Sequence, residues 1–174
     1  MRRAVVNSSP LIYLSKIHAL HLLTRVFDEV LIPQAVYGEV VSRGLERGYR
    51  DAVRVKEAVE RGEILVQDAP QREVERILRN FPELDPGEAE VLALALRLGA
   101  TVVVDERAAR LAARSLGLEP HGTLYILIAA TKRKVIDAEE ALKMLDKLVN
   151  ENFRVSAEVL RKARAELEAL VKEG

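Results

Sequence analysis

Asp105 is the residue of this chain whose position most clearly allows chemistry. It follows a run of one threonine and three valines, Thr101–Val104, and precedes a helical pattern that carries Ala108, Leu111 and Ala112. Because the run has no polar alternation, it is typical of a strand buried on both faces of a parallel sheet. Open α/β folds place their sites at the carboxyl ends of such strands. An isolated aspartate at this junction more often caps the following helix, so a site is indicated only if other residues converge on Asp105.

Two further residues are expected at the same edge of such a sheet. Asn7 follows the first expected strand, Arg3–Val6. Glu39 lies at the edge of the apolar arc of a helix expected from Pro33 to Val41, where a solvated boundary glutamate is the simpler interpretation. Each position alone is weak evidence, and their joint placement beside Asp105 is stronger.

The helix expected over Pro86–Leu98 separates two neighbouring acids by its periodicity. Glu88 falls near the middle of the apolar arc, whereas Glu90 lies opposite, beside Arg97, and should be exposed. Asp85 and Glu88, with a proline between them, also have the form of a capping box. A capping role and a role in a site are compatible, so both stay open.

These side chains offer only oxygen atoms as ligands. The chain has no cysteine, and its histidines, His18, His21 and His121, lack the spacings of zinc sites. Glu106, next to Asp105, is the one further carboxylate in a comparable position. Oxygen ligands favour hard cations, so the pattern indicates Mg²⁺ or Mn²⁺ rather than zinc.

Strand-like and helical patterns alternate before residue 105, which predicts a parallel sheet with helices on both faces. Ser9 and Pro10 are expected to supply the N-cap and the first-turn proline of the first helix. Gly44 and Gly48 are expected to break the helix after the second strand. The expected strands are Arg3–Val6, Glu29–Ile32, Ile64–Val66 and Thr101–Val104.

After Gly117 and Gly122 the remaining chain is expected to be helical, over residues 123–132, 138–149 and 157–171. The last two helices carry apolar stripes. These stripes are expected to pack on the sheet or on a second copy of the chain.

Composition places the chain among ordinary globular proteins. Its 174 residues suit one domain, and 27 basic residues balance 27 acidic ones, so the molecule as a whole has no field that attracts nucleic acid. A cluster of basic residues around Arg43, Arg47 and Arg50 is usually a solvated helix face, yet it could follow a phosphate backbone. No apolar run reaches the roughly 20 residues of a membrane span, and the N-terminus leads into a strand rather than a signal peptide, so a cytoplasmic protein is expected. Abundant charge without cysteine or tryptophan suits a thermophile.

Four ordered segments resemble PIN-domain proteins, and most closely the prokaryotic VapC-like branch with a Gly-Glu-Ala-Glu third motif. The resemblance covers about residues 3–135. The segments are Val5–Leu14, Leu31–Glu39, Pro86–Glu90 and Val104–Arg110, the last followed by Gly117 and Gly122-Thr123.

This resemblance implies a three-layer α/β/α fold with a central parallel sheet of about four to five short strands, plus two C-terminal helices. A PIN-like domain over residues 1–135 would carry a helical extension, 136–174, packed on the same domain or on a dimer partner. The implied activity is that of a Mg²⁺- or Mn²⁺-dependent ribonuclease, often the toxin of a toxin–antitoxin pair. The implied partners are RNA, an antitoxin and a second copy in a homodimer.

The resemblance also assigns roles to individual residues. Glu39, Glu88 and Asp105 are the expected catalytic, metal-binding acids. The expected further metal contacts are Asn7 and Glu106, and the expected supporting hydroxyls are those of Ser8 and Ser9. Apart from the resemblance, the expected RNA contacts are the basic residues Arg43, Arg47, Arg50 and Arg107.

Asn7 departs from the family pattern, which has aspartate at this position. An amide still offers a carbonyl oxygen, but the site loses one negative charge, so weaker metal binding and slower catalysis are expected. A PIN-fold module that binds RNA or protein without cleaving it is therefore the alternative. A phosphatase or receiver-like domain is disfavoured, because it would require an acid where Asn7 stands and a lysine after a later strand.

Overall fold

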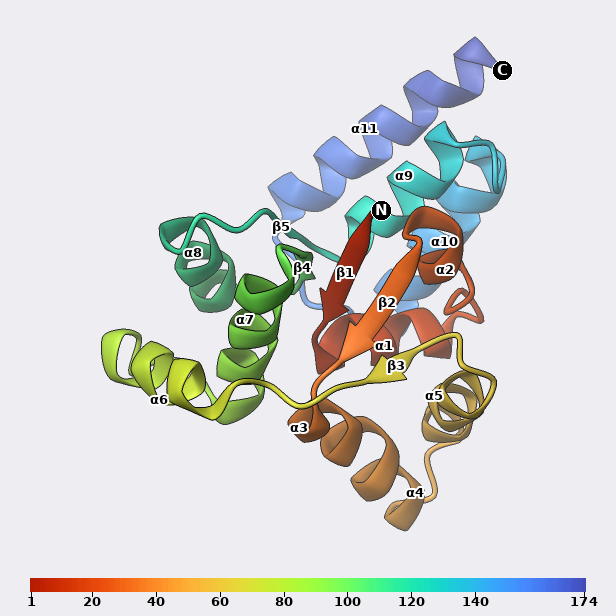
Figure 1. The fold of residues 1–174 in the computed structure, drawn as a ribbon. Coiled ribbons are helices and arrows are strands. Elements are labelled where there is room, and N and C mark those ends of the chain that lie inside the picture. Colours follow the sequence, from red (N-terminus) through yellow and green to blue (C-terminus); the bar gives the residue numbers. More distant parts are fainter.

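A computed structural model describes all of residues 1–174, and its centre is one parallel sheet (Figure 1). The strands lie in the order β3-β2-β1-β4-β5, and every neighbouring pair is parallel. Their bounds are β1 Arg3–Val6, β2 Glu29–Ile32, β3 Leu65–Val66, β4 Thr101–Val103 and β5 Pro120–His121. The predicted fold class, an α/β/α arrangement around about four to five short parallel strands, is confirmed.

β5 lies in a segment that was expected to contain only helices and loops. It has two residues, which pair with Val102 and Val103 of β4. A strand of this length that begins with proline has no periodicity from which it could be predicted.

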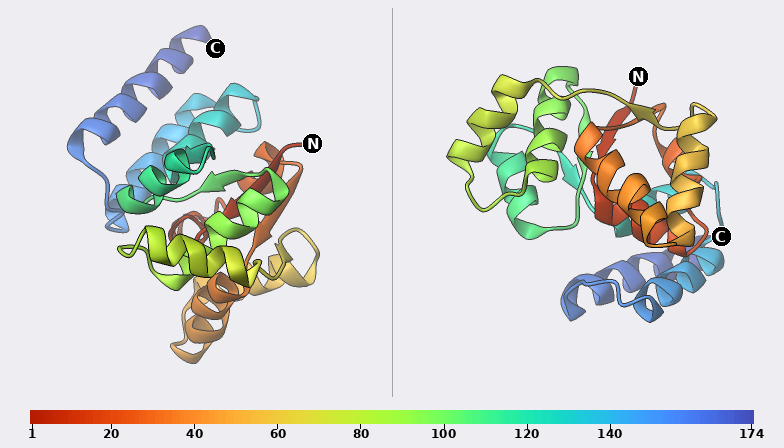
Figure 2. Two further views of the ribbon diagram at one scale, coloured as in Figure 1. Left: turned by 60° about the vertical axis from the view of Figure 1, so that its left-hand side comes forward. Right: turned by 90° about the horizontal axis from the view of Figure 1, so that it is seen from below.

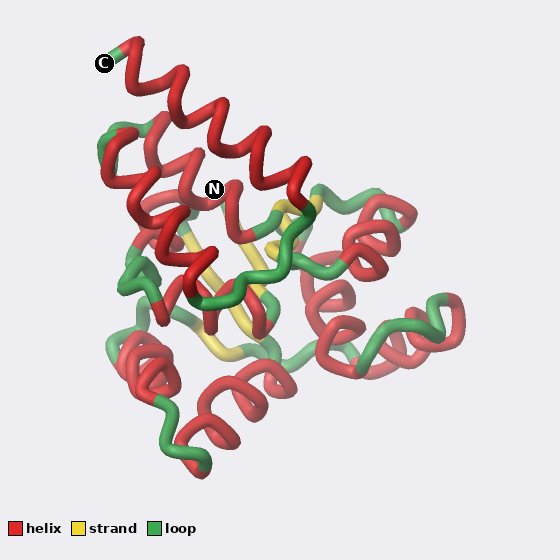
Figure 3. Tube along the Cα trace, turned by 180° about the vertical axis from the view of Figure 1, so that it is seen from behind, coloured by secondary structure: helices red, strands yellow, loops and turns green.

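The helices form two layers that cover opposite faces of the sheet, as Figure 1 and the reverse view in Figure 3 show. On one face α7 packs against β1 and β4, and α6 packs against α7. On the other face α2 contacts β2, and α9 contacts both α1 and α2. The helical elements are α1 Ser8–Lys16, α2 Leu22–Val26, α3 Gln34–Tyr37, the π-helix η1 Gly38–Ser42, α4 Arg43–Glu46, α5 Arg50–Glu60, α6 Gln71–Asn80, α7 Pro86–Leu98, α8 Arg107–Ser115, α9 Thr123–Lys132, α10 Ala138–Asn150 and α11 Ala157–Glu173.

The two central strands are buried on both faces. Ala4, Val5 and Val6 of β1 and Val102 and Val103 of β4 have no exposed surface. Helices on both sides of a parallel sheet require such continuous apolar strands, which is why the valine run predicted β4.

The expected helix break at Gly44 is wrong, because helical structure continues from Gln34 through Gly44 to Glu46. A β-carbon on Gly44 would lie 2.6 Å from the β-carbon of Ala52 in α5. Gly44 therefore allows α4 and α5 to approach closely. Gly48, with φ of 74°, does lie between the two helices, in the left-handed conformation that glycine adopts readily.

The last two helices pack within the same chain (Figure 2). Both α10 and α11 contact α9, and they also contact each other. Leu145 and Leu148 of α10 and Leu167 of α11 are fully buried. No helix combines the length and the apolar character that a membrane crossing needs.

Candidate active site

The strand order reverses between β1 and β4, and the candidate site lies at the carboxyl ends of these two strands. The chain moves from β1 outward to β3, and then returns across the sheet to β4 on the other side of β1. In open α/β sheets, the crevice at such a reversal is where ligands bind. Asn7 follows β1 and Asp105 lies two residues beyond β4, so both stand at this point.

Asp105 accepts three hydrogen bonds in a partly buried position. Thr123 donates its backbone N–H to Oδ1 at 2.8 Å and its hydroxyl to Oδ2 at 2.7 Å, and the hydroxyl of Ser9 donates to Oδ2 at 3.1 Å. Asp105 does not cap α8, whose N-cap is Glu106 and has no side-chain cap bond. The capping interpretation is therefore wrong: Asp105 binds the first turn of α9, a helix further along the chain.

Gly122 makes room for this carboxylate. A β-carbon at residue 122 would lie 2.9 Å from Asp105 Oδ1, closer than such atoms approach in proteins. Gly122 and Thr123 belong to the site, although the sequence indicated them only as a motif following Asp105.

Glu39 reaches the site from the π-helix η1. It is exposed, and Ser8 donates its hydroxyl to Oε2 at 2.8 Å. A π-helix has a wider turn than an α-helix and often occurs at functional sites. The rim position predicted for Glu39 agrees with its exposure.

Ser8 and Ser9 therefore bind acids and do not cap a helix. α1 begins at Ser8 with Asn7 as its N-cap, so the expected N-cap at Ser9 is wrong. Two consecutive residues in the first turn point to different neighbours, one to Glu39 and one to Asp105.

Glu88 is turned inward as predicted, with 7% of its surface exposed. It forms the capping box with Asp85: its Oε1 accepts the Asp85 N–H at 2.9 Å, and its own N–H donates to Asp85 Oδ1 at 2.7 Å. Desolvation raises the pKa of Glu88, the hydrogen bond from the Asp85 backbone opposes this rise, and repulsion from Asp85, Glu106 and Glu39 adds to it.

Glu106 faces the same cluster. Although the residue as a whole is exposed, desolvation of its carboxyl group raises its pKa, and Asp105 and Asp85 contribute further repulsion. The backbone of Glu106 itself, and to a smaller extent the Asn7 side chain, act in the opposite direction and lower this pKa.

We call Glu39, Glu88, Asp105 and Glu106 the acidic cluster. No salt bridge of the structure involves any of these four carboxylates. Oxygen donors with uncompensated negative charge have the chemistry that a hard divalent cation requires. In this structure no three His, Cys, Asp or Glu side chains are close enough together to hold one metal ion. Serine, threonine and backbone donors instead bind Glu39, Glu88 and Asp105 individually.

Glu90 and the arginines predicted to contact RNA lie outside the acidic cluster. Glu90 is half-buried rather than exposed, and its Oε1 accepts the backbone N–H of Ala35 at 3.4 Å. Helical phase placed it away from the apolar arc but did not include α3, which packs beside α7. Arg43, Arg47 and Arg50 are exposed in and beside α4. Of the predicted RNA contacts, Arg107 lines a groove with Asp105, as does Arg110, which the sequence did not indicate.

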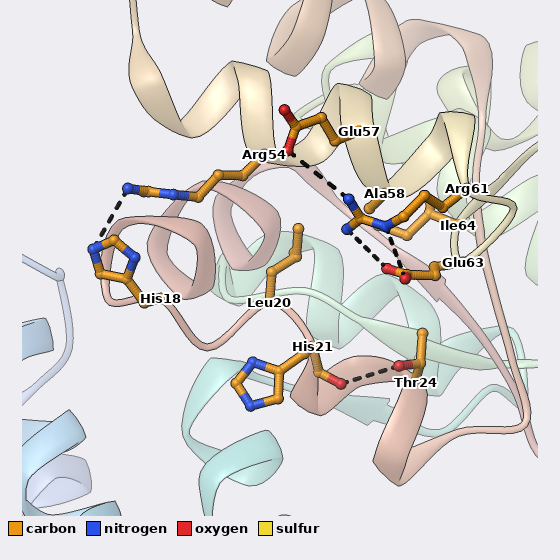
Figure 4. Close-up of a pocket in the computed structure, with 10 residues that line it drawn as sticks. All are labelled: His18, Leu20, His21, Thr24, Arg54, Glu57, Ala58, Arg61, Glu63 and Ile64. Atoms are coloured by element: carbon orange, nitrogen blue, oxygen red, sulfur yellow. Dashed lines mark hydrogen bonds and ion pairs between the residues drawn. The ribbon is translucent and has the colours of Figure 1, made fainter.

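A separate hollow between the α1–α2 connection and α5 contains two of the histidines but none of the acidic cluster (Figure 4). Arg54 donates to His18, and Arg61 pairs with Glu57 and Glu63. His121 belongs neither to this hollow nor to the acidic cluster, and its side chain contacts that of Glu119.

A family model described as a PIN domain matches residues 3–169. The chain therefore belongs to the PIN-domain family, whose fold is of the nuclease type. Among solved structures, the crystal structure of PAE2754 from Pyrobaculum aerophilum is similar, with 15% identity and a TM-score of 0.54 over 75% of this chain and 98% of that chain. At this identity the likeness concerns the fold alone. No curated protein matches the chain.

Proposed function

We propose that this protein is an endoribonuclease that depends on Mg²⁺ or Mn²⁺. The observation that carries the proposal is the acidic cluster near the β1–β4 reversal, whose four carboxylates take part in no salt bridge and of which Glu88 and Glu106 are subject to repulsion from neighbouring acids. When bound there, a divalent cation would lower the pKa of a water molecule and neutralise charge on the scissile phosphate.

The residues of the chain would divide the work of holding and orienting this site. Glu39, Glu88 and Asp105 would bind the cation, and Glu106 with Asn7 would complete the shell. Ser8, Ser9 and Thr123 fix the orientation of Glu39 and Asp105 through hydrogen bonds. Outer partners of this kind typically change metal affinity or activity about 10- to 100-fold when they are removed.

The direct test is cleavage of RNA by the purified protein in Mn²⁺. We expect Glu39→Gln and Asp105→Asn to lower the rate at least about tenfold, because each removes a ligand charge. Glu90→Gln is the matched control, since Glu90 lies on the same helix as Glu88 and outside the acidic cluster, and it should cleave like the wild type. Equal cleavage by all four proteins would show a contaminant and would contradict the proposal.

Asn7 favours a second candidate function, a PIN-fold module that binds RNA without cleaving it. The amide leaves the site one charge short of the family pattern. We expect Asn7→Asp to raise Mn²⁺ affinity, measured by calorimetry, and to raise the cleavage rate. If both quantities stay unchanged, our account of Asn7 is wrong.

The biological setting is also a proposal. A toxin of a toxin–antitoxin pair fits the VapC-like resemblance, and a small antitoxin-like reading frame beside the gene would support it. A homodimer is proposed on the same ground, and light scattering of the full chain measures it.

A further inference from the structure

A groove of about 960 Å³ begins at Asp105 and extends between α8, α9 and α11. Its far wall consists of α11 and of the segment that joins α10 to α11. Figure 3 shows α11 lying across this side of the molecule, beside α9. The groove therefore reaches the acidic cluster at Asp105, and residues of the C-terminal helix form part of its lining.

The charge of the groove differs from that of the molecule. The whole chain has no net charge, yet the lining holds seven lysines and arginines and only two acids, Asp105 and Glu166. Glu166 is paired with Lys132 at 2.8 Å.

None of the five arginines of the lining has an acidic partner, and four of them also make no side-chain hydrogen bond, whereas Arg133 donates to the Val26 carbonyl. Of these four, Arg107, Arg110 and Arg114 are spaced along α8, and Arg154 lies in the segment before α11. None of them takes part in a salt bridge. Unpaired guanidinium groups along one wall suit a chain of phosphates.

The same groove exposes flat and apolar surface between these charges. Leu111 of α8 is 50% exposed and Val159 of α11 is 44% exposed, and both line the groove. Tyr125 also lines it and stacks on His121, with ring centroids 3.7 Å apart and an angle of 13° between the planes. Aromatic faces and apolar side chains are the surfaces on which unpaired bases stack.

We infer that this groove binds single-stranded RNA and leads it to the acidic cluster. The phosphates lie along Arg107, Arg114 and Arg154, and the bases lie over Tyr125 and Val159. The inference rests on the proposed ribonuclease function, which would cleave the RNA that the groove binds. Binding of RNA to the groove can nevertheless be measured without cleavage. A duplex, whose bases are already paired, cannot use the apolar surface.

The test is binding of a fluorescently labelled, unstructured RNA of about 20 nucleotides, measured by anisotropy in EDTA so that no cleavage occurs. The variant is Arg107→Gln, Arg114→Gln and Arg154→Gln combined. We expect at least about tenfold weaker binding in this triple variant. We also expect the slope of log affinity against log salt to fall in magnitude by about 2, since each phosphate contact on a single strand contributes about 0.7.

Two other triple variants control for the loss of charge. Arg72→Gln, Arg79→Gln and Arg97→Gln remove three exposed arginines of α6 and α7 that also lack salt bridges, and this variant should bind within about twofold of the wild type. Arg43→Gln, Arg47→Gln and Arg50→Gln test the basic cluster near α4, which lies at the opposite end of the molecule from α11 (Figure 1).

The outcomes separate the inference from the proposed function. If the triple variant of Arg107, Arg114 and Arg154 loses RNA affinity while wild type does not cleave RNA in Mn²⁺, the inference about the groove is supported and the ribonuclease proposal fails. If the triple variant of Arg43, Arg47 and Arg50 loses more affinity than the groove variant, or if all three triple variants bind RNA equally, the groove is not the RNA path. Equal affinity for duplex and single strand would also overturn the inference. If the triple variant of Arg107, Arg114 and Arg154 no longer binds a protein partner but binds RNA like the wild type, the groove is the binding site of that partner instead.

Discussion

At the scale of single residues, the acidic cluster consists of carboxylates with different surroundings. Asp105 accepts three hydrogen bonds and is held in place by them. Glu88 is buried, and its pKa is raised chiefly by desolvation. Burial therefore opposes the ionisation of Glu88 in the folded protein.

The raised pKa of Glu88 predicts a pH-dependent cost to stability. Because the folded pKa lies above the unfolded one, the folded protein binds more protons between the two values, and the free energy of unfolding falls as pH rises through that window. In EDTA, Glu88→Gln should raise the melting temperature at pH 7 by about 2 to 4 °C. Glutamine keeps the capping box, since it accepts the same backbone hydrogen bond.

The gain in melting temperature of Glu88→Gln should disappear below the pKa of Glu88 in the unfolded chain, near pH 4, because the wild-type carboxyl is then protonated in both the folded and the unfolded state. Glu90→Gln serves as the control and should show no such gain. A pH-independent difference between Glu88→Gln and wild type would mean that ionisation of Glu88 does not limit stability. Added Mn²⁺ should stabilise wild type more than Glu88→Gln, because ligand binding to the folded state raises stability and the variant lacks the proposed carboxylate ligand at residue 88.

At the scale of elements, the contact between Asp105 and the start of α9 joins the site to the second helix layer. Thr123 is fully buried and donates both its N–H and its hydroxyl to Asp105. The N-terminal N–H groups of a helix have no partner within the helix, so an acid supplied by another element satisfies one of them.

Thr123→Val should therefore lower both stability and activity. Loss of the hydroxyl donor is expected to cost about 1 to 2 kcal/mol in the free energy of unfolding. The cleavage rate should fall as well, because Asp105 loses one of the bonds that orient it. Chemical denaturation and RNA cleavage measure the two effects.

Thr131→Val is the matched control in the same helix. Thr131 is buried, and its hydroxyl donates to the Leu127 carbonyl at 2.7 Å, away from the acidic cluster. This variant should change stability without changing the rate per folded molecule. If both variants leave cleavage unchanged, the bond from Thr123 does not position Asp105.

Long periodic elements could be predicted from the sequence, whereas the contacts between them could not. The bounds of α7 and α9 match the prediction, because the capping box with Pro86 and Gly99 mark the two ends of α7, Gly122 precedes α9, and the apolar pattern of each helix is continuous. Asp105 was expected to cap α8, since sequence reasoning considers the nearest helix and the actual partner is 18 residues away. The half-burial of Glu90 was missed for the same reason, because its partner Ala35 belongs to another helix.

At the scale of the whole molecule, α10 and α11 contribute to the same core as the sheet. Leu145, Leu148 and Leu167 belong to one continuous apolar cluster with β1 and β4. A chain cut after Ile136 would expose these contacts, so it is a poor reagent for measuring the oligomeric state.

Leu167→Ala should lower the free energy of unfolding by about 2 to 5 kcal/mol, the usual cost of a cavity left by a buried leucine. The melting curve should keep a single transition, because α11 folds with the rest. Val171→Ala, at an exposed position of the same helix, should have little effect. A separate early transition in Leu167→Ala would show that α11 folds on its own.

The bond between Asp105 and Thr123 also sets when, during synthesis, the site is completed. The ribosome makes the chain from its N-terminus, so Glu39, Glu88 and Asp105 all emerge before the residue that fixes Asp105. β5, which pairs with β4, and α9, which begins at Thr123, emerge later still. A growing chain that ends before residue 123 thus has the acids but lacks the Thr123 bonds to Asp105. The candidate site of a chain assembled in this order stays incomplete while most of its own message is being read.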